Sequence, residues 1–161
     1  NRRLFGDRLN VAIERSHRLN GRLALFMLDL NGFKKINDSL GHDAGDQVLR
    51  EVSKNLSESV RSLDTLARLG GDEFTLIAED LRDSHSVDRL QDAIRDAVER
   101  PIMVNGQCMI VSASMGVAIY PDDWQDSATL LRHDDPRLYS LKQRPAPQMH
   151  MEPDLATIPP A

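Results

Sequence analysis

The sequence predicts a single α+β domain in which helices flank a central, mostly antiparallel sheet. Its 161 residues are about the length of one domain, and 40% hydrophobic with 28% charged residues is ordinary for a globular protein. Helical and strand-like periodicities alternate along the chain. A Gly-Gly pair between two short apolar runs indicates a β-hairpin, which joins antiparallel strands.

The first part of the chain predicts a helix, a buried strand and a second helix. Apolar residues recur at helical spacing in residues 2–18, which predicts an amphipathic helix. Residues 22–30, RLALFMLDL, are a continuous apolar run, typical of a strand buried on both faces. The polar stretch 31–46, taken alone, favours a solvated loop, and helical spacing is clear within 41–60.

The middle of the chain predicts a hairpin and a third helix. Residues 64–80 are interpreted as two short strands around Gly70 and Gly71, because both glycines can take the positive φ of a tight turn. Helical spacing follows this hairpin. It is marked by Val87, Leu90, Ile94 and Val98.

The last third predicts strands, one more helix and a tail. Residues 107–121 are interpreted as one long strand that pairs with residues 101–106. Leucines within 130–141 suggest a final helix. Residues 145–161 contain five prolines and no periodicity, so we expect a disordered tail or linker after a domain of residues 1–144.

Charge and cysteine content limit the classes of function. The net charge of −5 argues against a DNA or RNA partner, although local cations, helix N-termini or a metal could still bind a phosphorylated small molecule. The single cysteine, Cys108, excludes an internal disulfide, and its strand-like flanks favour a structural thiol over a nucleophile. With no apolar run of ~18 residues and no signal peptide, we expect a cytoplasmic domain; the abrupt start suggests a piece of a longer protein whose membrane attachment stays open.

Two acidic positions form a candidate metal site. Asp29 ends the buried strand, and Asp72 and Glu73 follow the glycines of the hairpin. If the strand lies beside the hairpin, the carboxylates of Asp29 and Asp72 converge at one sheet edge, where hard oxygen ligands suit Mg²⁺. The alternative is an aspartate that caps a strand and an acidic pair in a solvated turn; spacing alone leaves both open.

The polar stretch after the strand could read a purine. Asn37 offers a donor and an acceptor, and Asp46 accepts from ring and exocyclic N–H groups, while Lys34 and Lys35 could meet phosphate. The alternative is a solvated loop with Asp43 near a helix N-cap, and taken alone this alternative is favoured.

Three motifs together resemble the GGDEF family, the diguanylate cyclases. They are RLGGDEF at 68–74, DLNGFKKINDSLGHDAGDQVL at 29–49 and SASMGVAIYP at 112–121, and the resemblance runs from Asn1 to about Lys142. It implies a palm-like antiparallel sheet of the nucleotide-cyclase type, with a ferredoxin-like core. It also implies condensation of two GTP into cyclic di-GMP and two pyrophosphates by a homodimer, with Mg²⁺ or Mn²⁺, in a protein fused to sensory or other signalling domains.

The resemblance implies a role for each matching residue. The metal ligands are the carboxylates of Asp29 and Asp72 and the backbone carbonyl of Leu30. The catalytic group is Asp72 with Glu73, which assists the metal site, and Lys34, which stabilises phosphate charge. The substrate-binding residues are Asn37, His42, Asp46, Gly70, Gly71 and Lys142.

An RxxD sequence before the hairpin resembles the family's product-inhibition site. Arg61 and Asp64 occupy its two positions, and Arg89 is a weaker candidate for its second arginine. Arginine can donate two parallel hydrogen bonds to guanine or phosphate, and aspartate can accept from the guanine N1–H edge. The alternative is an exposed ion pair of little energetic worth.

The C-terminal part departs from the family pattern. Lys142 keeps the phosphate-binding lysine, but Ala146 stands where the family has a later arginine, and Pro136 falls where the last helix should be under way. These changes favour a second hypothesis, a catalytically weak or degenerate module that binds GTP or cyclic di-GMP. A third hypothesis, another purine nucleotide cyclase, is disfavoured by Asn37 and Asp46.

Overall fold

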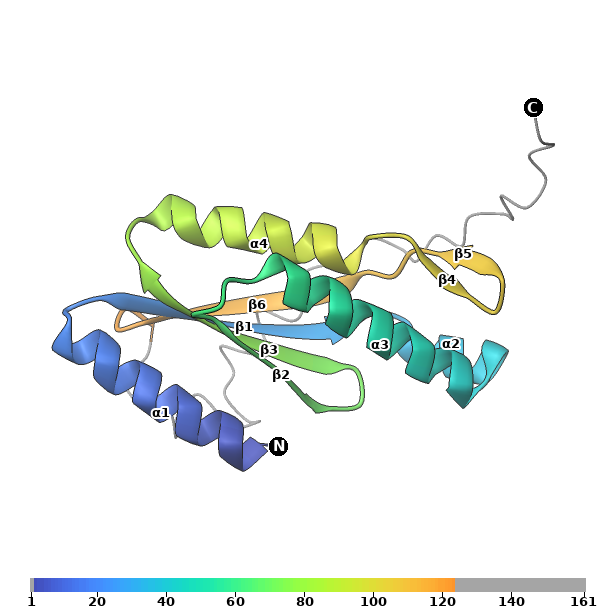
Figure 1. The fold of residues 1–161 in the computed structure, drawn as a ribbon, viewed down its shortest axis with the longest axis horizontal. Helices are drawn as coiled ribbons and strands as arrows, with labels where there is room; N and C mark the ends of the chain where they lie inside the picture. The colour runs from blue at the N-terminus through green and yellow to red at the C-terminus, as the bar shows by residue number, and fades with distance from the viewer. Residues whose placement is uncertain (1, 124–161) are drawn as a thin grey trace.

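A four-stranded antiparallel sheet forms the centre of the molecule (Figure 1). The computed structural model describes residues 2–123, with Ser84 described without its side chain. The strand order is β2-β3-β1-β6, so β1 lies between β3 and β6. The predicted α+β class is confirmed. The strands are β1 (Arg22–Leu30), β2 (Thr65–Gly70), β3 (Glu73–Leu81) and β6 (Ala113–Tyr120).

Helices cover both faces of this sheet. Helix α1 (Arg2–Arg18) lies against one face, where its buried side chains join a small cluster with β1, β3 and β6. Helix α3 (His42–Ser59) and helix α4 (Ser84–Val98) cover the other face and bury a larger cluster. The three predicted helices in this part of the chain are therefore confirmed.

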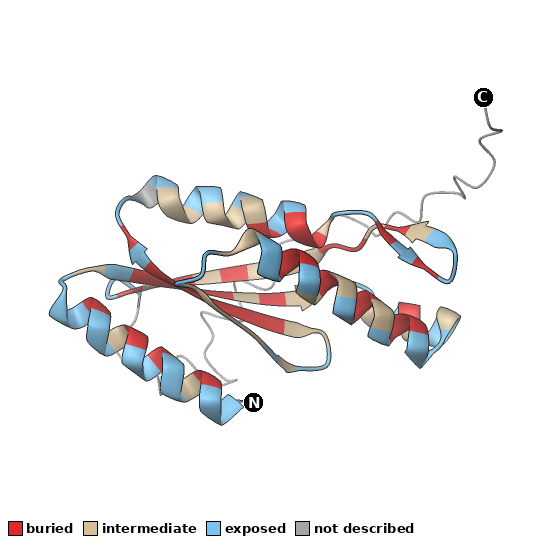
Figure 2. Cartoon of the chain, in the orientation of Figure 1, coloured by how far each residue is buried: buried red, intermediate tan, exposed pale blue. Residues whose placement is uncertain are grey.

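The apolar run of β1 is explained by its central position. Leu23 and Leu25 face α1, while Phe26 and Leu28 face α3 and α4, and all four are 2% exposed or less. Buried positions gather along the sheet and on the helix sides that face it (Figure 2). Because neighbouring side chains of a strand point to opposite faces, a strand with helices on both sides needs apolar residues at every position. Each such side chain contributes about 1.5–3 kcal/mol when fully buried.

The stretch expected to be a solvated loop contains a helix, so that prediction was wrong. Helix α2 (Phe33–Leu40) follows directly on β1 after Gly32, whose φ of 69° is left-handed. Ile36 is buried in the larger core cluster, and Phe33 packs against it. Leu40 packs against the same cluster, and these three apolar anchors on one face stabilise a helix whose remaining surface is polar.

The hairpin between β2 and β3 turns one residue later than predicted. Gly71 and Asp72 are the turn residues, and the pairing changes from Arg68 opposite Phe74 to Gly70 opposite Glu73. One extra residue on β2 therefore makes a bulge. Gly71 has a φ of +49°, which glycine adopts at little cost.

The predicted long strand at 107–121 is divided. Strand β4 (Ile102–Val104) pairs with β5 (Gln107–Met109) in a separate two-stranded sheet, and β6 begins only at Ala113 and pairs with β1. The small sheet packs against α3, where Gln47 Nε2 donates to the carbonyl of Met103 at 3.2 Å. The predicted final helix and the predicted tail lie outside the described residues.

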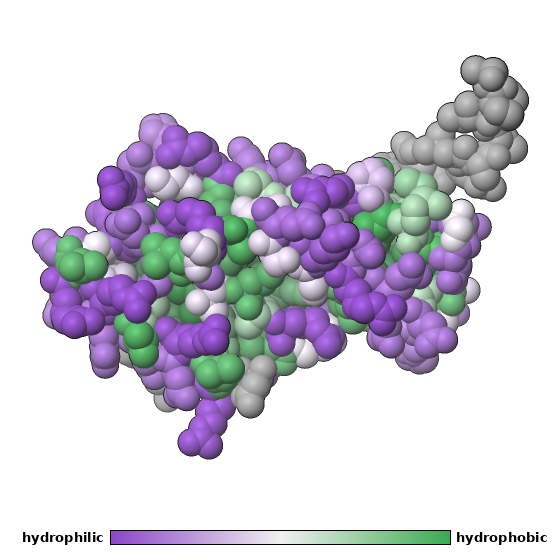
Figure 3. Space-filling view, viewed as in Figure 1, coloured by the Kyte–Doolittle hydropathy of each residue, from purple (hydrophilic) through white to green (hydrophobic). Residues whose placement is uncertain are grey.

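Hydrophilic side chains cover the outer surfaces of the helices, and apolar ones appear in the band between them (Figure 3). Cys108 lies half-buried on β5. Within residues 2–123, no helix combines the length and the apolar character that crossing a membrane requires.

The start of α4 carries an acid-sensitive cap. Asp83 Oδ1 accepts from Ser86 N–H at 2.7 Å and from Ser86 Oγ at 3.0 Å. The backbone N–H of Ser86, then its hydroxyl, lowers the pKa of Asp83. A lowered carboxyl pKa means that this stabilisation is present above the pKa of the unfolded chain and is lost as pH falls through the folded value.

Substituting Asp83 should therefore change the acid side of the stability profile. Asp83→Asn keeps an acceptor oxygen but cannot titrate, so we expect Tm to fall less between pH 6 and pH 3 than it does in the wild type. Asp83→Ala should lower Tm at pH 7. Thermal unfolding followed by circular dichroism measures both, and parallel profiles for wild type and Asp83→Asn would contradict the cap assignment.

Candidate functional site

The predicted metal positions meet at one end of the sheet. The N–H of Leu30 donates to the carbonyl of Asp72 at 3.2 Å, and Glu73 is the register partner of Asp29. Opposite residues of an antiparallel pair place their side chains on the same face. Asp29 and Glu73 therefore share the α1 face of the sheet, and Asp72 lies beside Leu30 in the adjoining turn.

Polar side chains hold this sheet end together. Asn31 Nδ2 donates to Ser112 Oγ at 3.0 Å, and Ser114 Oγ donates to Asn31 Oδ1 at 2.8 Å. The N–H of Asn31 also donates to the carbonyl of Ser112 at 2.9 Å. Asn31 thus ties the end of β1 to β6, which fixes the backbone that carries Asp29. On the other side, Arg2 Nη2 lies 3.8 Å from Glu73 Oε2.

The donors at this end fit Mg²⁺. Across residues 2–123, no three His, Cys, Asp or Glu side chains are grouped closely enough to hold a metal by themselves. Mg²⁺ usually takes one or two protein carboxylates and completes its octahedron with waters and substrate phosphates. The carboxylates of Asp29 and Asp72 and the carbonyl of Leu30 match that requirement in number and hardness.

The corner between α2 and α3 brings the predicted purine-reading residues together. The carbonyl of Asn37 accepts from Gly41 N–H at 2.9 Å, and the carbonyl of Gly41 accepts from Gly45 N–H at 3.2 Å. The Asn37 side chain lies over Gly45, directly before Asp46. In the described part of the chain its carboxamide has no hydrogen-bond partner. His42 opens α3 at the same corner and is exposed.

A hollow of about 470 Å³ connects this corner to the hairpin. Asp46 and Arg50 line it from α3, and Arg68 lines it from β2. Arg68 Nη1 also donates to the carbonyl of Gly71 at 3.0 Å, so it links the hollow to the hairpin turn. Sequence reasoning missed both arginines. Arg68 stands just before the two glycines, and Arg50 lies one helical turn after Asp46, so a search for cations near the acids could have found them.

The remaining predicted substrate residues lie around this region. Lys34 is exposed in the first turn of α2. A Cβ at Gly70 or Gly71 would meet no atom of residues 2–123 within 4 Å, so within that range only their positive φ values restrict these positions. Lys142 lies outside the described residues.

The RxxD residues form a tight pair. Arg61 Nε and Nη2 donate to the two carboxylate oxygens of Asp64 at 3.2 and 2.9 Å, and Arg61 N–H donates to Asp64 Oδ2 at 3.0 Å. The Asp64 side chain is 0% exposed and that of Arg61 is 51% exposed. The hydrogen bond with Asp64 raises the pKa of Arg61. The pair is therefore an ion pair with a covered carboxylate and a half-exposed guanidinium, and its role in product binding stays a prediction.

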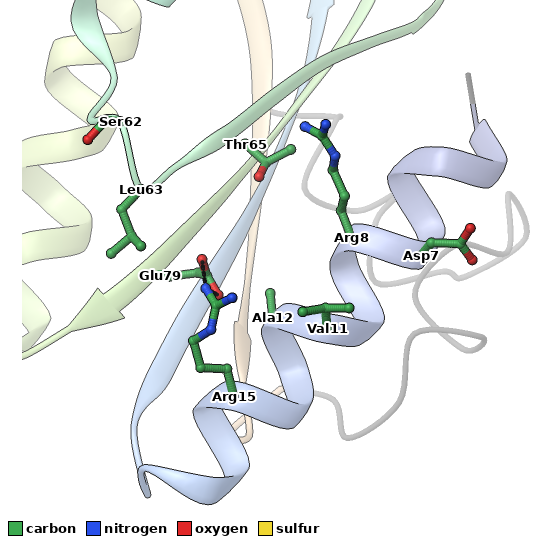
Figure 4. A pocket seen from close by; sticks show the side chains of 9 residues that line it. All are labelled: Asp7, Arg8, Val11, Ala12, Arg15, Ser62, Leu63, Thr65 and Glu79. Atoms are coloured by element: carbon green, nitrogen blue, oxygen red, sulfur yellow. Dashed lines mark hydrogen bonds and ion pairs between the residues drawn. The ribbon is translucent and has the colours of Figure 1, made fainter.

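A second hollow, of about 430 Å³, separates α1 from the loop that carries this motif (Figure 4). Arg15 of α1 turns toward Glu79 of β3 and donates from Nη1 to both carboxylate oxygens at 3.1 and 3.0 Å. The carbonyl of Glu79 accepts from Arg61 Nη2 at 2.7 Å. Glu79 thus connects α1 to the RxxD loop. Arg89 instead contacts Ser86 and Asp83 at the start of its own helix.

The fold and site together define an α+β domain with an antiparallel sheet between helices and acidic residues at one sheet end. The chain belongs to the GGDEF family: the family described as "Diguanylate cyclase, GGDEF domain" matches residues 1–148. It resembles MucR of Pseudomonas aeruginosa, a bifunctional diguanylate cyclase/cyclic di-GMP phosphodiesterase, with 38% identity over 89% of this chain and 21% of MucR.

Two further similarities bear on fold and function. The cyclic di-GMP phosphodiesterase NbdA of Pseudomonas aeruginosa is 40% identical over 78% of this chain and 16% of NbdA. The crystal structure of the GGDEF domain of YfiN, or TpbB, from the same organism has a TM-score of 0.84 with 34% identity, and the match covers 91% of each chain. The chain thus spans about a fifth or less of MucR and NbdA.

Proposed function

We propose that this domain condenses two GTP molecules into cyclic di-GMP and two pyrophosphates. The observation that supports the proposal is the placement of Asp29, Asp72 and Glu73 at one sheet end, with Asp46 lining a hollow whose other wall is Arg68 of the same hairpin. Arg68 contacts the carbonyl of Gly71 in the turn that carries Asp72, so oxygen ligands and cations lie on the same hairpin, and the base-reading corner lies across the hollow from it. These are the parts that nucleotidyl transfer requires.

The residues suggest how one GTP would be oriented. Asn37 and Asp46 would hold the guanine edge at the α2–α3 corner. The N-terminal N–H groups of α2 have no side-chain cap, and with Lys34 they would receive the phosphates. With the guanine at the α2–α3 corner and the phosphates at the start of α2, the triphosphate would extend toward Asp29 and the hairpin turn. Gly70 and Gly71 present no Cβ there, so the backbone can approach the nucleotide closely.

Mg²⁺ would be held by Asp29, Asp72 and the carbonyl of Leu30, and when bound it eases ionisation of a ribose 3′-OH and offsets charge on the α-phosphate. Lys34 and Arg68 would stabilise charge on the phosphates, and Glu73 would assist the metal carboxylates. The site has places for one nucleotide, whereas the product contains two. Two domains would therefore face each other in a symmetric homodimer, each contributing half of the reacting pair.

Product binding at Arg61, Asp64 and Arg89 is the proposed means of feedback. Arg61 Nη1 has no hydrogen-bond partner in the described part of the chain, so it can contact a guanine or phosphate without breaking the Asp64 pair. Asp64 is covered, and it would reach a guanine edge only after Arg61 swings away.

A second candidate function is a binding module without turnover. It is supported by the similarity to NbdA, which is named as a phosphodiesterase, and by the departures at Pro136 and Ala146. Such a domain would bind GTP or cyclic di-GMP, and the bound nucleotide would change the activity of an attached domain.

Product analysis distinguishes the two candidates. The domain, dimerised by a fused coiled coil, is incubated with GTP and Mg²⁺, and the nucleotides are separated by anion-exchange chromatography. We expect cyclic di-GMP and pyrophosphate to form, and to disappear when EDTA removes the metal. GTP binding without any cyclic di-GMP at high protein concentration would leave only the binding module.

A further inference from the structure

We propose that Gly45 is a positioning residue that sets guanine selectivity by leaving room for the side chain of Asn37. The inference rests on the proposed binding of GTP and goes beyond it, because Gly45 itself would touch no nucleotide. The missing side chain at Gly45 of α3 would let Asn37 of the preceding helix contact the base.

The geometry at Gly45 is unusually close. A Cβ built there would collide with Asn37 Oδ1, would lie 2.9 Å from Asn37 Cγ and would lie 3.2 Å from Phe33 Cζ. Contacts below 3.0 Å are essentially never seen for real Cβ atoms, so a side chain at this position would push the carboxamide away. Gly45 is buried and belongs to the helical part of α3. Its backbone conformation is one that alanine also adopts.

Glycine at position 45 affects the orientation of the Asn37 carboxamide rather than the stability of α3. Glycine inside a helix is about 1 kcal/mol less favourable than alanine, so the helix alone would favour alanine at this position. The Asn37 side chain, which occupies the space of a Cβ, explains why this position is glycine. Asn37 and Asp46 must present their polar groups together to one base edge, and a shift of about 1 Å in either would spoil that alignment.

Gly45→Ala tests this positioning role. We expect its affinity for a non-hydrolysable GTP analogue to fall roughly tenfold while its affinity for the matching ATP analogue is unchanged, because only the guanine contact of Asn37 is lost. Isothermal titration calorimetry with Mg²⁺ measures both. Gly21→Ala is the matched control, since among the described residues a Cβ there meets only Ser16 O at 3.9 Å. Its affinities should equal those of the wild type.

A double substitution separates positioning from general damage. Asn37→Ala should lose the same roughly tenfold, and adding Gly45→Ala to it should cost no further affinity, because the obstructed carboxamide is gone. Without nucleotide, the side-chain amide signal of Asn37 in a ¹⁵N–¹H spectrum should shift in Gly45→Ala and stay in place in Gly21→Ala. An unshifted signal, or a second independent tenfold loss in the double variant, overturns the proposal.

Binding by the wild type distinguishes failure of the Gly45 role from failure of the proposed function. If it binds the GTP analogue and prefers it to the ATP analogue, and Gly45→Ala keeps the same preference, the positioning role is wrong and the proposed function stands. If the wild type binds neither analogue, or binds both equally, the proposed guanine-reading site is wrong and the role of Gly45 falls with it.

Discussion

Asp72→Ala should reduce the formation of cyclic di-GMP by about 1,000-fold, which corresponds to about 4 kcal/mol of transition-state stabilisation. The side chain is one of only two carboxylates assigned to Mg²⁺, and the remaining donors cannot place the ion against both the attacking oxygen and the α-phosphate. Asp72 is also at the turn itself, beside the end of β1 that carries Asp29, where the nucleotide is proposed to bind. Steady-state rates with GTP and Mg²⁺ measure the loss.

The fold should survive this substitution. The hydrogen bond that ties Asp72 to β1 uses its backbone carbonyl, which alanine retains. We therefore expect Tm to change little, and Asp96→Ala, at an exposed position on α4, to keep the wild-type rate. Equal activity of Asp72→Ala and Asp96→Ala would remove Asp72 from the catalytic group, whereas unfolding of the variant would show that the turn has a structural role instead.

Much of the fold could be predicted because the residues of β1, α1 and α4 follow strict patterns. Residues 23–28 are apolar at every position, and a strand between two layers of helices requires that. Helix α2 was missed because it is short and its apolar anchors, Phe33, Ile36 and Leu40, stand among polar residues, and short polar helices owe their stability to packing rather than to propensity. The neighbours of β1 could not be predicted from local pattern, since β3 and β6 are far away in the sequence.

The residues of the candidate site were predicted from the sequence, but the hollow between α3 and β2 was not. Asp29, Asp72, Asn37 and Asp46 were identified from residue type and motif, and the structure places the first two at one sheet end and the last two at one corner. The hollow between Asp46 and Arg68 depends on α3 crossing near β2. No sequence spacing encodes that crossing, so the hollow could only be found in three dimensions.

Arg61→Ala should weaken the binding of cyclic di-GMP by at least about tenfold and also lower the free energy of unfolding, by about 1–2 kcal/mol. The first effect follows from the loss of the guanidinium that contacts the ligand. The second follows because the fully buried carboxylate of Asp64 would lose its two side-chain hydrogen bonds and keep only the one from residue 61 N–H. The half-exposed position of Arg61 reduces this cost below that of a fully buried pair.

Calorimetry with cyclic di-GMP and urea unfolding of the same variants separate the two effects. Arg89→Ala should weaken ligand binding with little change in unfolding, because its own contacts, at 3.4 and 3.8 Å, are long and exposed. Arg95→Ala, another exposed arginine on α4, is the control and should change neither. If Arg61→Ala loses stability but binds cyclic di-GMP as well as Arg95→Ala does, the RxxD sequence is a structural lock between Asp64 and Glu79, and feedback at this position is wrong.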